Sequence, residues 1–496
     1  MVAFEAGAVA ALAAARRAQA AWRELPLDER LGVVRRLRGR LADRALDIAG
    51  SVTLPQRSGP AETLSAEVLP LLDACRYLER EAGRVLAPRR LGRRRRPLWL
   101  AGSRVELRRE PRGVVLVIGP ANYPLLLPGV QAIQALVAGN AVLVKPAPGA
   151  SAPLRMLADE LAAAGLPEGL LQPLGEEVEW ASAAIAAGVD LVVLTGSHAT
   201  GRAVLARLAE QVTPAVMELS GCDPVLVADD ADLDLAANAL RFGLTLNGSF
   251  TCIAPRRVFV HAERAVELEE RLRSRLAGVA ERPLAPGVAS RVAALAGEAI
   301  EAGARVVAGS LPARDAMAPL VLAEVPAGCA ILSADLAAPV LMLQPVAGDE
   351  EALARAADCP YRLGATVFGR GAAARRLAGR VAAGVVVVND LIVPTADPRV
   401  PFGGSGASGF GVTRGAEGLL EMTVPRAIIE RGGRFRPHFD PTRPGDERLF
   451  AAFAAALHAP TLGARLRAAL EVARLGAARR QRQGERRGVS GTRRTA

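Results

Sequence analysis

The sequence predicts an α/β protein with more than one domain, and three observations lead to this fold class. Its 496 residues exceed what one hydrophobic core usually serves. From Gly113 onward, short β-branched runs alternate with helical stretches, which is typical of a parallel sheet covered by helices. Hydrophobic residues make up 51% of the chain and aromatic residues only 3%. Cores built largely from Ala, Leu and Val suit helices packed closely on parallel strands.

The predicted elements follow in order along the chain. Residues 1–87 have helical patterns, one of them after the cap candidate Asp28 and another over about 61–87. Strands are predicted at 113–118, 141–144, 191–194 and 215–219, with helices over 129–138, from residue 152 and from residue 201. A second α/β series over about 225–410 predicts a second domain.

Charge and cysteine content narrow the function classes. The net charge of +11 is concentrated in an arginine cluster at 89–96 and in the last 20 residues. Neither cluster has interleaved aromatic residues or a nucleic-acid-binding module, so a solvated surface or a disordered tail is favoured over nucleic-acid binding. No run of 18 or more apolar residues lacks charges, so we expect no transmembrane segment. The cysteines (Cys75, Cys222, Cys252, Cys329 and Cys359) show no metal-ligand spacing and predict free thiols in a reducing cytoplasm, with no metal site.

One position is distinguished by carrying a lysine where the rest of the chain uses arginine. The 62 Lys and Arg residues include a single lysine, Lys145, directly after the apolar run Ala-Val-Leu-Val. A compact ammonium on a flexible stem can reach a ribose hydroxyl or a phosphate in a narrow pocket, which a forked guanidinium does poorly. The alternative is that Lys145 is a chance survivor in an arginine-rich chain.

Two further segments favour binding of a charged group. Asn122 lies between two prolines after a strand, either as a turn residue or as a rigid amide donor for an oxyanion. Residues 195–201, Thr-Gly-Ser-His-Ala-Thr-Gly, form a glycine turn between a strand and a helix, where backbone amides and Ser197 can hold a pyrophosphate.

Two residues are candidates for covalent and acid–base chemistry. Glu218 ends an otherwise apolar strand; such a residue is a surface charge, a salt-bridge partner or, at the carboxyl edge of a parallel sheet, a general base. Cys252 follows Asn-Gly-Ser-Phe-Thr and, taken alone, reads as a small buried hydrophobic residue. Its occurrence with the other four segments favours a nucleophile.

The order and spacing of these segments resemble the aldehyde dehydrogenase superfamily, in its NAD(P)-dependent, hydrolytic type. The matching motifs are Gly-Pro-x-Asn-Tyr-Pro, Ala-Gly-Asn-Ala-Val-Leu-Val-Lys-Pro, Thr-Gly-Ser-x-x-x-Gly, Glu-Leu-x-Gly, Cys-Ile-Ala-Pro-Arg-Arg and the segment 401–409. The resemblance covers roughly residues 10–430. It implies that an aldehyde is oxidised to a carboxylic acid through a cysteine thiohemiacetal and a thioester.

The resemblance assigns roles to individual residues. Cys252 would be the nucleophile, Glu218 the base that activates water and Asn122 the oxyanion donor. Lys145, Gly196, Ser197, Gly201 and Asp335 would bind NAD or NADP. Because Pro148 occupies the position where NAD-restricted members often have a glutamate, we expect no carboxylate to compete for Lys145 and NADP to be accepted.

The resemblance also implies a domain organisation. A Rossmann-like NAD(P)-binding domain would comprise 1–97 and 111–219, a catalytic domain 220–410, and a small β oligomerisation arm 98–110 and 411–435. The protein would be a cytoplasmic homodimer or homotetramer. Beyond the resemblance, residues 436–476 predict a C-terminal helical extension and 477–496 a disordered basic tail. Docking of the extension on the protein's own body is favoured over a subunit contact or a membrane surface.

Five positions depart from the family pattern: Ala121, Ser220, Phe250, Asp335 and Ala337. Ala121 and Ala337 replace larger rings near the cofactor, and Asp335 is one methylene shorter than the usual glutamate. These changes allow the alternative that the protein is a catalytically weak or silent relative of these enzymes and acts as a binding or structural protein.

Overall fold

The computed structural model describes residues 2–433, 436–439 and 441–491. The chain divides into two compact units, residues 1–92 with 105–428, and residues 93–104 with 429–496. Within the described part of the chain, none of the helices has the length and apolarity needed to span a bilayer.

The N-terminal region is helical, as the sequence predicts. The helices are α1 (Val2–Trp22), α2 (Leu27–Asp43), α3 (Ala45–Ser51), α4 (Pro60–Thr63) and α5 (Leu69–Leu86), with a π-helical turn at Leu64–Val68 before α5. The predicted stripe on α2 is its buried face, since Leu31, Val34, Leu37 and Leu41 are buried. These helices share one core with the first sheet.

The first sheet has six strands in the order β19-β7-β6-β3-β4-β5. Its strands and helices are β3 (Val114–Ile118), α6 (Leu126–Val137), β4 (Ala141–Lys145), α7 (Ser151–Ala163), β5 (Leu171–Pro173), α8 (Val178–Ala187), β6 (Leu191–Gly196), α9 (His198–Gln211), β7 (Ala215–Leu219) and β19 (Gly409–Phe410). All pairings are parallel except β19 on β7, where Gly409 opposes Glu218. The carboxyl ends of β3, β4, β6 and β7 therefore meet at one edge, where ligands bind in sheets of this kind.

The second sheet has seven strands in the order β11-β13-β14-β9-β8-β16-β17. Its elements are β8 (Asp223–Val227), α10 (Leu233–Thr245), β9 (Pro255–His261), α11 (Ala262–Leu276), α12 (Val288–Glu301), β11 (Arg305–Ala308), β13 (Leu320–Ala323), β14 (Val340–Val346), α13 (Asp349–Ala357), β16 (Gly364–Phe368), α14 (Gly371–Ala378) and β17 (Val385–Val388). Two-stranded pairs are made by β10 (Arg282–Pro283) with β12 (Ala316–Met317) and by β15 (Tyr361–Arg362) with β18 (Ser405–Gly406).

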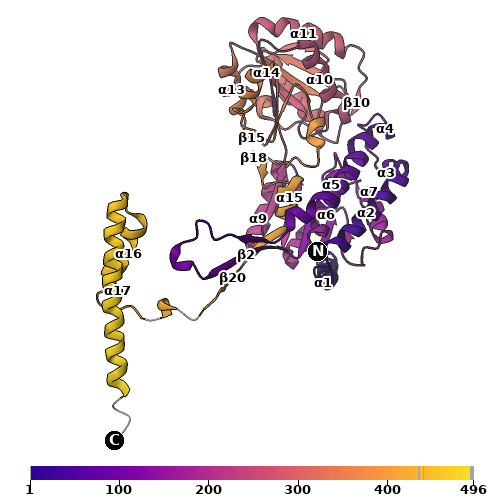
Figure 1. Ribbon diagram of the computed structural model, residues 1–496. Coiled ribbons are helices and arrows are strands. Elements are labelled where there is room, and N and C mark those ends of the chain that lie inside the picture. The colour runs from indigo at the N-terminus through magenta and orange to yellow at the C-terminus, as the bar shows by residue number, and fades with distance from the viewer. Residues whose placement is uncertain (1, 434–435, 440, 492–496) are drawn as a thin grey trace. The chain divides into compact units, whose positions relative to one another are not determined.

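Alternate residues of the second sheet pack against different helices. Val225 and Val258 belong to the core that includes α10 and α11, whereas Leu226 and Phe259 belong to the core that includes α13 and α14. Figure 1 shows these two helix pairs on opposite sides of the sheet. Because helices cover both faces of this sheet, nearly every residue along its strands must be apolar.

Three strands form a separate small sheet in the order β1-β2-β20, where β1 is Arg89–Leu91, β2 is Ser103–Pro111 and β20 is Thr423–Arg431. β20 falls within the segment 411–435 of the expected oligomerisation arm, and β2 overlaps the segment 98–110 except for its last residue, Pro111. The short helix α15 (Gly415–Glu421) precedes β20.

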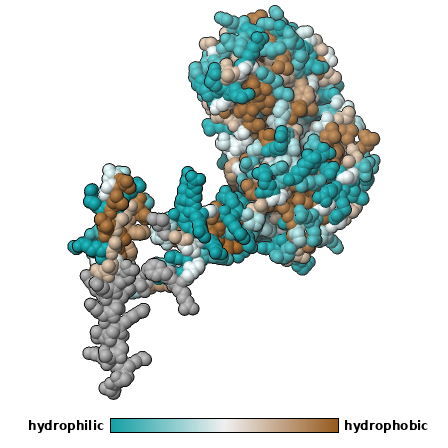
Figure 2. All heavy atoms as spheres, in the orientation of Figure 1, coloured by the Kyte–Doolittle hydropathy of each residue, from teal (hydrophilic) through white to brown (hydrophobic). Residues whose placement is uncertain are grey.

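The C-terminal region forms a helical hairpin of α16 (Asp446–His458) and α17 (Leu462–Gly491), which pack on each other. Leu462, Leu466 and Leu470 are exposed on α17, and Figure 2 shows hydrophobic side chains gathered on this hairpin. The backbone of 477–491 is helical, which differs from the predicted disorder. Ala, Arg and Gln dominate residues 477–483 and have high helix propensity. Residues 492–496 of the predicted tail lie outside the described residues.

Candidate active site

Cys252 follows a loop with an unusual backbone. After α10, the residues Asn247, Gly248 and Ser249 have successive φ angles of 52°, 57° and 60°. This left-handed region is costly for residues other than glycine, so surrounding contacts must hold it. The Asn247 Oδ1 accepts a hydrogen bond from Arg57 Nε at 3.1 Å, and the Ser249 carbonyl accepts one from Arg256 Nη2 at 2.7 Å. Two buried arginines thus fix the loop that presents the thiol.

Glu218 lies near the end of β7 and is buried. Its Oε2 accepts a hydrogen bond from Thr413 Oγ1 at 2.7 Å, while its Oε1 is buried without a hydrogen-bond partner. Burial raises the pKa of Glu218, and both the nearby Arg414 charge and the Thr413 hydrogen bond oppose that rise. One carboxylate oxygen is therefore held and the other is free to accept a proton from a bound water.

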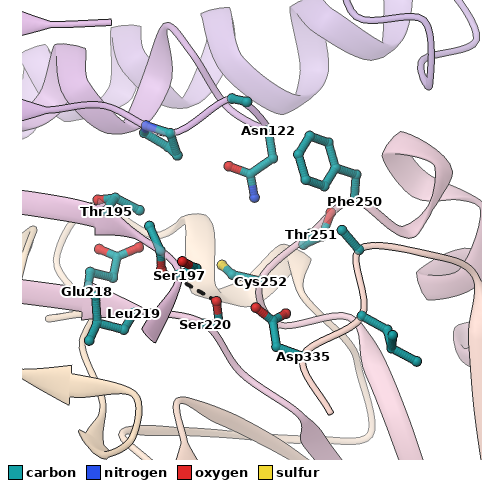
Figure 3. A pocket seen from close by; sticks show the side chains of 15 residues that line it. Asn122, Thr195, Ser197, Glu218, Leu219, Ser220, Phe250, Thr251, Cys252 and Asp335 are labelled. Carbon is teal, nitrogen blue, oxygen red and sulfur yellow. Dashed lines mark hydrogen bonds between the residues drawn. The ribbon is translucent and has the colours of Figure 1, made fainter. Parts of the chain in front are cut away.

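Asn122 is held by both its backbone and its side chain. Its carbonyl accepts from Arg57 Nη2 at 3.1 Å and from Asn247 Nδ2 at 3.0 Å, and its Oδ1 accepts from the Tyr123 N–H at 3.0 Å. Because the amide oxygen is engaged, the amide nitrogen is the end left to donate. Figure 3 shows Asn122 and Cys252 pointing into one cavity from opposite walls, with Glu218 and Asp335 on either side.

The cavity between these residues has a volume of about 270 Å³. It brings together six of the predicted site residues: Asn122, Gly196, Ser197, Glu218, Cys252 and Asp335. All five positions that depart from the family pattern also line it (Ala121, Ser220, Phe250, Asp335 and Ala337). The departures therefore alter the wall of this cavity while leaving Cys252, Glu218 and Asn122 in place.

Two predicted cofactor residues, Lys145 and Gly201, are not among the residues that line this cavity. Gly201 lies on α9, where an added Cβ would be 2.6 Å from the Leu219 side chain. The glycine therefore lets α9 pack closely on β7, because any larger side chain would collide there. Lys145 ends β4, next to Ile118 of β3 in register.

Glutamates contribute to the electrostatic surroundings of Lys145. Burial lowers the pKa of Lys145, and the charges of Glu176, Glu177 and Glu179 act in the opposite direction. Glu176 also accepts hydrogen bonds from the Gly149 N–H at 2.7 Å and the Ser151 N–H at 3.1 Å. The region at the start of α8 therefore adds negative charge near Lys145, although Pro148 itself carries none.

The described residues fit a dinucleotide. The carboxyl ends of β6 and β7 open into the cavity, and α9, a helix of 14 residues, begins at its edge. Ser197 caps α9 by accepting from the Thr200 N–H at 3.1 Å, and its hydroxyl shares a hydrogen bond of 2.9 Å with the Thr200 hydroxyl. The N-terminus of a helix of this length at the edge of the cavity suits a pyrophosphate.

A second cavity of about 320 Å³ also reaches these reactive groups. Glu218, Thr251 and Cys252 line both cavities. Most other residues around the second cavity are apolar, among them Leu126, Leu127, Phe242 and Phe402. Cys252 and Glu218 therefore lie where the two cavities meet.

The two cysteines near Glu218 differ in access. Cys252 is partly exposed and lines both cavities, whereas Cys222 is buried, lines neither and contacts the Leu332 carbonyl through its Sγ at 3.7 Å. Burial raises the pKa of Cys252, and the Glu218 and Asp223 charges raise it further. The resting group is therefore a neutral thiol at pH 7.

Sequence reasoning missed several residues that shape the site: Arg57, Glu67, Asn247, Thr413 and Arg414. Arg57 and Glu67 form a buried ion pair at 2.6 Å, and Glu67 also accepts from the Leu125 and Leu126 N–H groups at the start of α6. Nothing local distinguishes Arg57 among so many arginines. Thr413 and Arg414 stand directly after the late glycine-rich motif, which was a signal that the region lies near the site.

These features define an α/β protein in which a cysteine, a carboxylate and an amide line one cavity, and comparison with known proteins gives its family. The aldehyde dehydrogenase family model matches residues 3–428. A Methylomonas protein, 4,4'-diapolycopene aldehyde oxidase, is 32% identical over 427 residues, which cover 84% of this chain and 80% of that one. The chain belongs to the aldehyde dehydrogenase family.

Solved structures agree with this assignment. The NADP-dependent glyceraldehyde-3-phosphate dehydrogenase of Bacillus halodurans, complexed with NADP, has a TM-score of 0.79 and 27% identity, covering 86% of this chain and 91% of that one. The Mycobacterium tuberculosis aldehyde dehydrogenase complexed with NAD+ has a TM-score of 0.78 and 26% identity, covering 87% and 92%. The predicted α/β fold class and NAD(P)-dependent aldehyde dehydrogenase activity are confirmed.

Proposed function

We propose that Cys252, Glu218 and Asn122 oxidise an aldehyde to a carboxylic acid by covalent catalysis. The Cys252 thiol loses its proton to solvent, the thiolate sulfur bonds to the aldehyde carbon, and the carbon–oxygen π bond breaks to leave an alkoxide. The Asn122 amide and the Cys252 backbone N–H donate hydrogen bonds to that oxygen; loss of one such donor typically costs about 3 kcal/mol. NAD or NADP supplies a hydride acceptor, so the carbon leaves this step as a thioester.

Glu218 acts in the second half of the reaction. Its free Oε1 takes a proton from water, the hydroxide adds to the thioester carbon, and the carbon–sulfur bond breaks. The products are the acid and the Cys252 thiolate. The observation that carries this proposal is the position of Cys252 and Glu218 on the walls of both cavities, because the nucleophile must meet aldehyde and cofactor at once.

Cofactor contacts are proposed at Gly196, Ser197, Asp335 and Lys145, with Gly201 contributing through helix packing. The first three line the first cavity, and Lys145 ends strand β4. Lys145, Gly196, Ser197 and Gly201 belong to the six-stranded half of the chain, and the seven-stranded half supplies Asp335 and Cys252.

Replacing Cys252 by Ala tests the nucleophile. Turnover should fall to background while folding and cofactor binding remain, since a small thiol becomes a small methyl. Cys222→Ala is the matched control and should stay active. An inactive Cys222→Ala with an active Cys252→Ala would reverse the assignment.

Replacing Glu218 by Gln tests the base. We expect a burst of about one equivalent of reduced cofactor followed by a slow steady rate, because the thioester still forms but water is no longer activated. Equal losses in burst and steady state would show that Glu218 acts before hydride transfer.

We also propose a cytoplasmic homodimer or homotetramer that associates through the β1-β2-β20 sheet. The five free cysteines and the extended strands of this sheet support the proposal. Light scattering during size-exclusion chromatography should give a mass of two or four chains; a monomer would contradict it.

A further inference from the structure

We propose that the second cavity selects an uncharged aldehyde with an apolar tail and excludes aldehydes that carry a carboxylate. This inference rests on the proposed role of Cys252 and adds the substrate class. The cavity reaches Cys252 and has a volume of about 320 Å³, well above what a two- or three-carbon aldehyde fills.

Apolar side chains from several elements form most of the wall. Leu126 and Leu127 come from α6, Phe242 from α10, Leu246 from the turn after α10, and Val393 and Phe402 from the segment after β17. Removal of apolar area from water is the main source of binding affinity for such a surface. A hydrocarbon tail therefore gains binding free energy in this cavity, whereas a polar tail does not.

The polar groups in the wall are already hydrogen-bonded to the protein. The Tyr123 hydroxyl and the Thr251 Oγ1 lie 2.8 Å apart and bond to each other. The Thr395 hydroxyl donates to the Ile392 carbonyl at 2.7 Å, and the Ser65 hydroxyl donates to the Glu62 carbonyl at 3.1 Å. The hydroxyl hydrogens of Ser65 and Thr395 are thus not available to a substrate carboxylate.

The charges in the wall also disfavour an anionic tail. Among the described residues that line this cavity, only Glu218 and Arg414 are charged. Arg414 donates from Nη1 to the Thr395 carbonyl at 2.7 Å, lies 4.5 Å from the centre of the Phe402 ring, and acts electrostatically on Glu218, while its Nε is buried without a hydrogen-bond partner. With Glu218 ionised, the wall already holds one negative and one positive charge, so a substrate carboxylate would leave a net negative charge in the cavity.

The exposure of the lining residues indicates where a tail leaves the cavity. Val393 is 57% exposed and Phe242 is 37% exposed, whereas Leu126, Leu127 and Phe402 are buried. A tail extending from Cys252 would pass the buried residues first and reach Val393 and Phe242 at the mouth.

Octanal and 8-oxooctanoate form a matched pair for the test, since they have the same length and differ in the terminal group. We expect the full-length protein with NAD or NADP to show kcat/KM roughly a hundredfold or more higher for octanal. In the series butanal, hexanal, octanal, kcat/KM should rise about tenfold for each two methylenes. Equal or better use of 8-oxooctanoate overturns the inference.

A variant at the mouth gives an independent check that does not disturb the interior. Val393→Arg adds a cation at an exposed position and should raise kcat/KM for 8-oxooctanoate relative to octanal by about tenfold. Val393→Gln introduces a longer polar side chain without a charge. Comparing the two variants therefore separates the effect of charge from the effect of side-chain size. If Val393→Arg and Val393→Gln give the same ratio of the two substrates, the tail does not pass this residue and the inference fails.

Cys252→Ala distinguishes failure of the substrate class from failure of the proposed function. If the wild type prefers 8-oxooctanoate and Cys252→Ala is inactive on both aldehydes, only the substrate class is wrong. If Cys252→Ala retains activity, or the wild type oxidises no aldehyde of the panel, the proposed function is wrong and the inference falls with it.

Discussion

The hydrogen bond from Thr413 to Glu218 gives a quantitative prediction about the pH dependence of the enzyme. The Thr413 hydroxyl lies 2.7 Å from Oε2 of a buried carboxylate, and this bond lowers the pKa of Glu218 against the effect of burial. Thr413→Val keeps the shape of the side chain and removes the donor. Hydrogen bonds to charged groups contribute about 1.5–3 kcal/mol.

Loss of this hydrogen bond shifts the acid limb of the pH profile in a definite direction. Glu218 must be ionised to accept a proton from water, so loss of a bond to its ionised form moves the acid limb of the steady-state rate to higher pH. Since one pKa unit corresponds to about 1.36 kcal/mol, we expect a displacement of about one to two pH units. Arg414 remains and continues to favour the carboxylate.

The assay is the pH profile of kcat in parallel with the amplitude of the pre-steady-state burst. The burst should keep its amplitude because Glu218 acts after hydride transfer. Thr413→Ser retains the hydroxyl and should have the wild-type limb. A Thr413→Val enzyme that loses activity equally at all pH values would refute the reasoning and assign Thr413 a purely structural role.

Three further predictions concern the cofactor, stability and the thiol. Glu176→Gln removes a negative charge near Lys145 but keeps an acceptor for the Gly149 and Ser151 N–H groups. The ratio of kcat/KM with NADP to kcat/KM with NAD should therefore rise about threefold to tenfold in steady-state kinetics. Pro148→Glu adds a negative charge and should move the preference toward NAD. Arg57→Met leaves Glu67 buried without its ion-pair partner and should lower the free energy of unfolding in urea by about 3–5 kcal/mol. Arg380→Met, which breaks the exposed Arg380–Glu350 pair, is the control and should leave the free energy of unfolding nearly unchanged. Because the pKa of Cys252 lies above its ordinary value, the burst rate constant should keep rising between pH 7 and pH 9, and a plateau below pH 8 would contradict this.

Much of the fold could be predicted from the sequence because the patterns are local. The apolar stripe of α2, the buried runs that became β3, β4 and β6, and the glycine turn before α9 each depend on residues within one or two turns or strands. The same holds for Cys252, Glu218 and Asn122, which stand at strand ends or in short motifs. Parallel strands bring their carboxyl ends to one edge, so these residues were expected to meet.

Residues that act on the site from a distance along the chain could not be predicted in this way. Arg57 holds Asn122 and Asn247, which follow it by 65 and 190 positions, and Glu176 reaches the loop that Pro148 occupies. These contacts depend on side-chain reach after folding and leave no periodic signal.

The sequence by itself therefore determined the fold class and the family and identified candidate reactive residues, because periodicity and motif spacing are properties of short segments. Only the tertiary structure decided which carboxylates lie near Lys145, how Thr413 and Arg414 oppose the effect of burial on Glu218, and that a cavity with a mostly apolar wall leads to Cys252. Those features arise from side chains that are far apart in the chain and interact strongly once water is excluded between them.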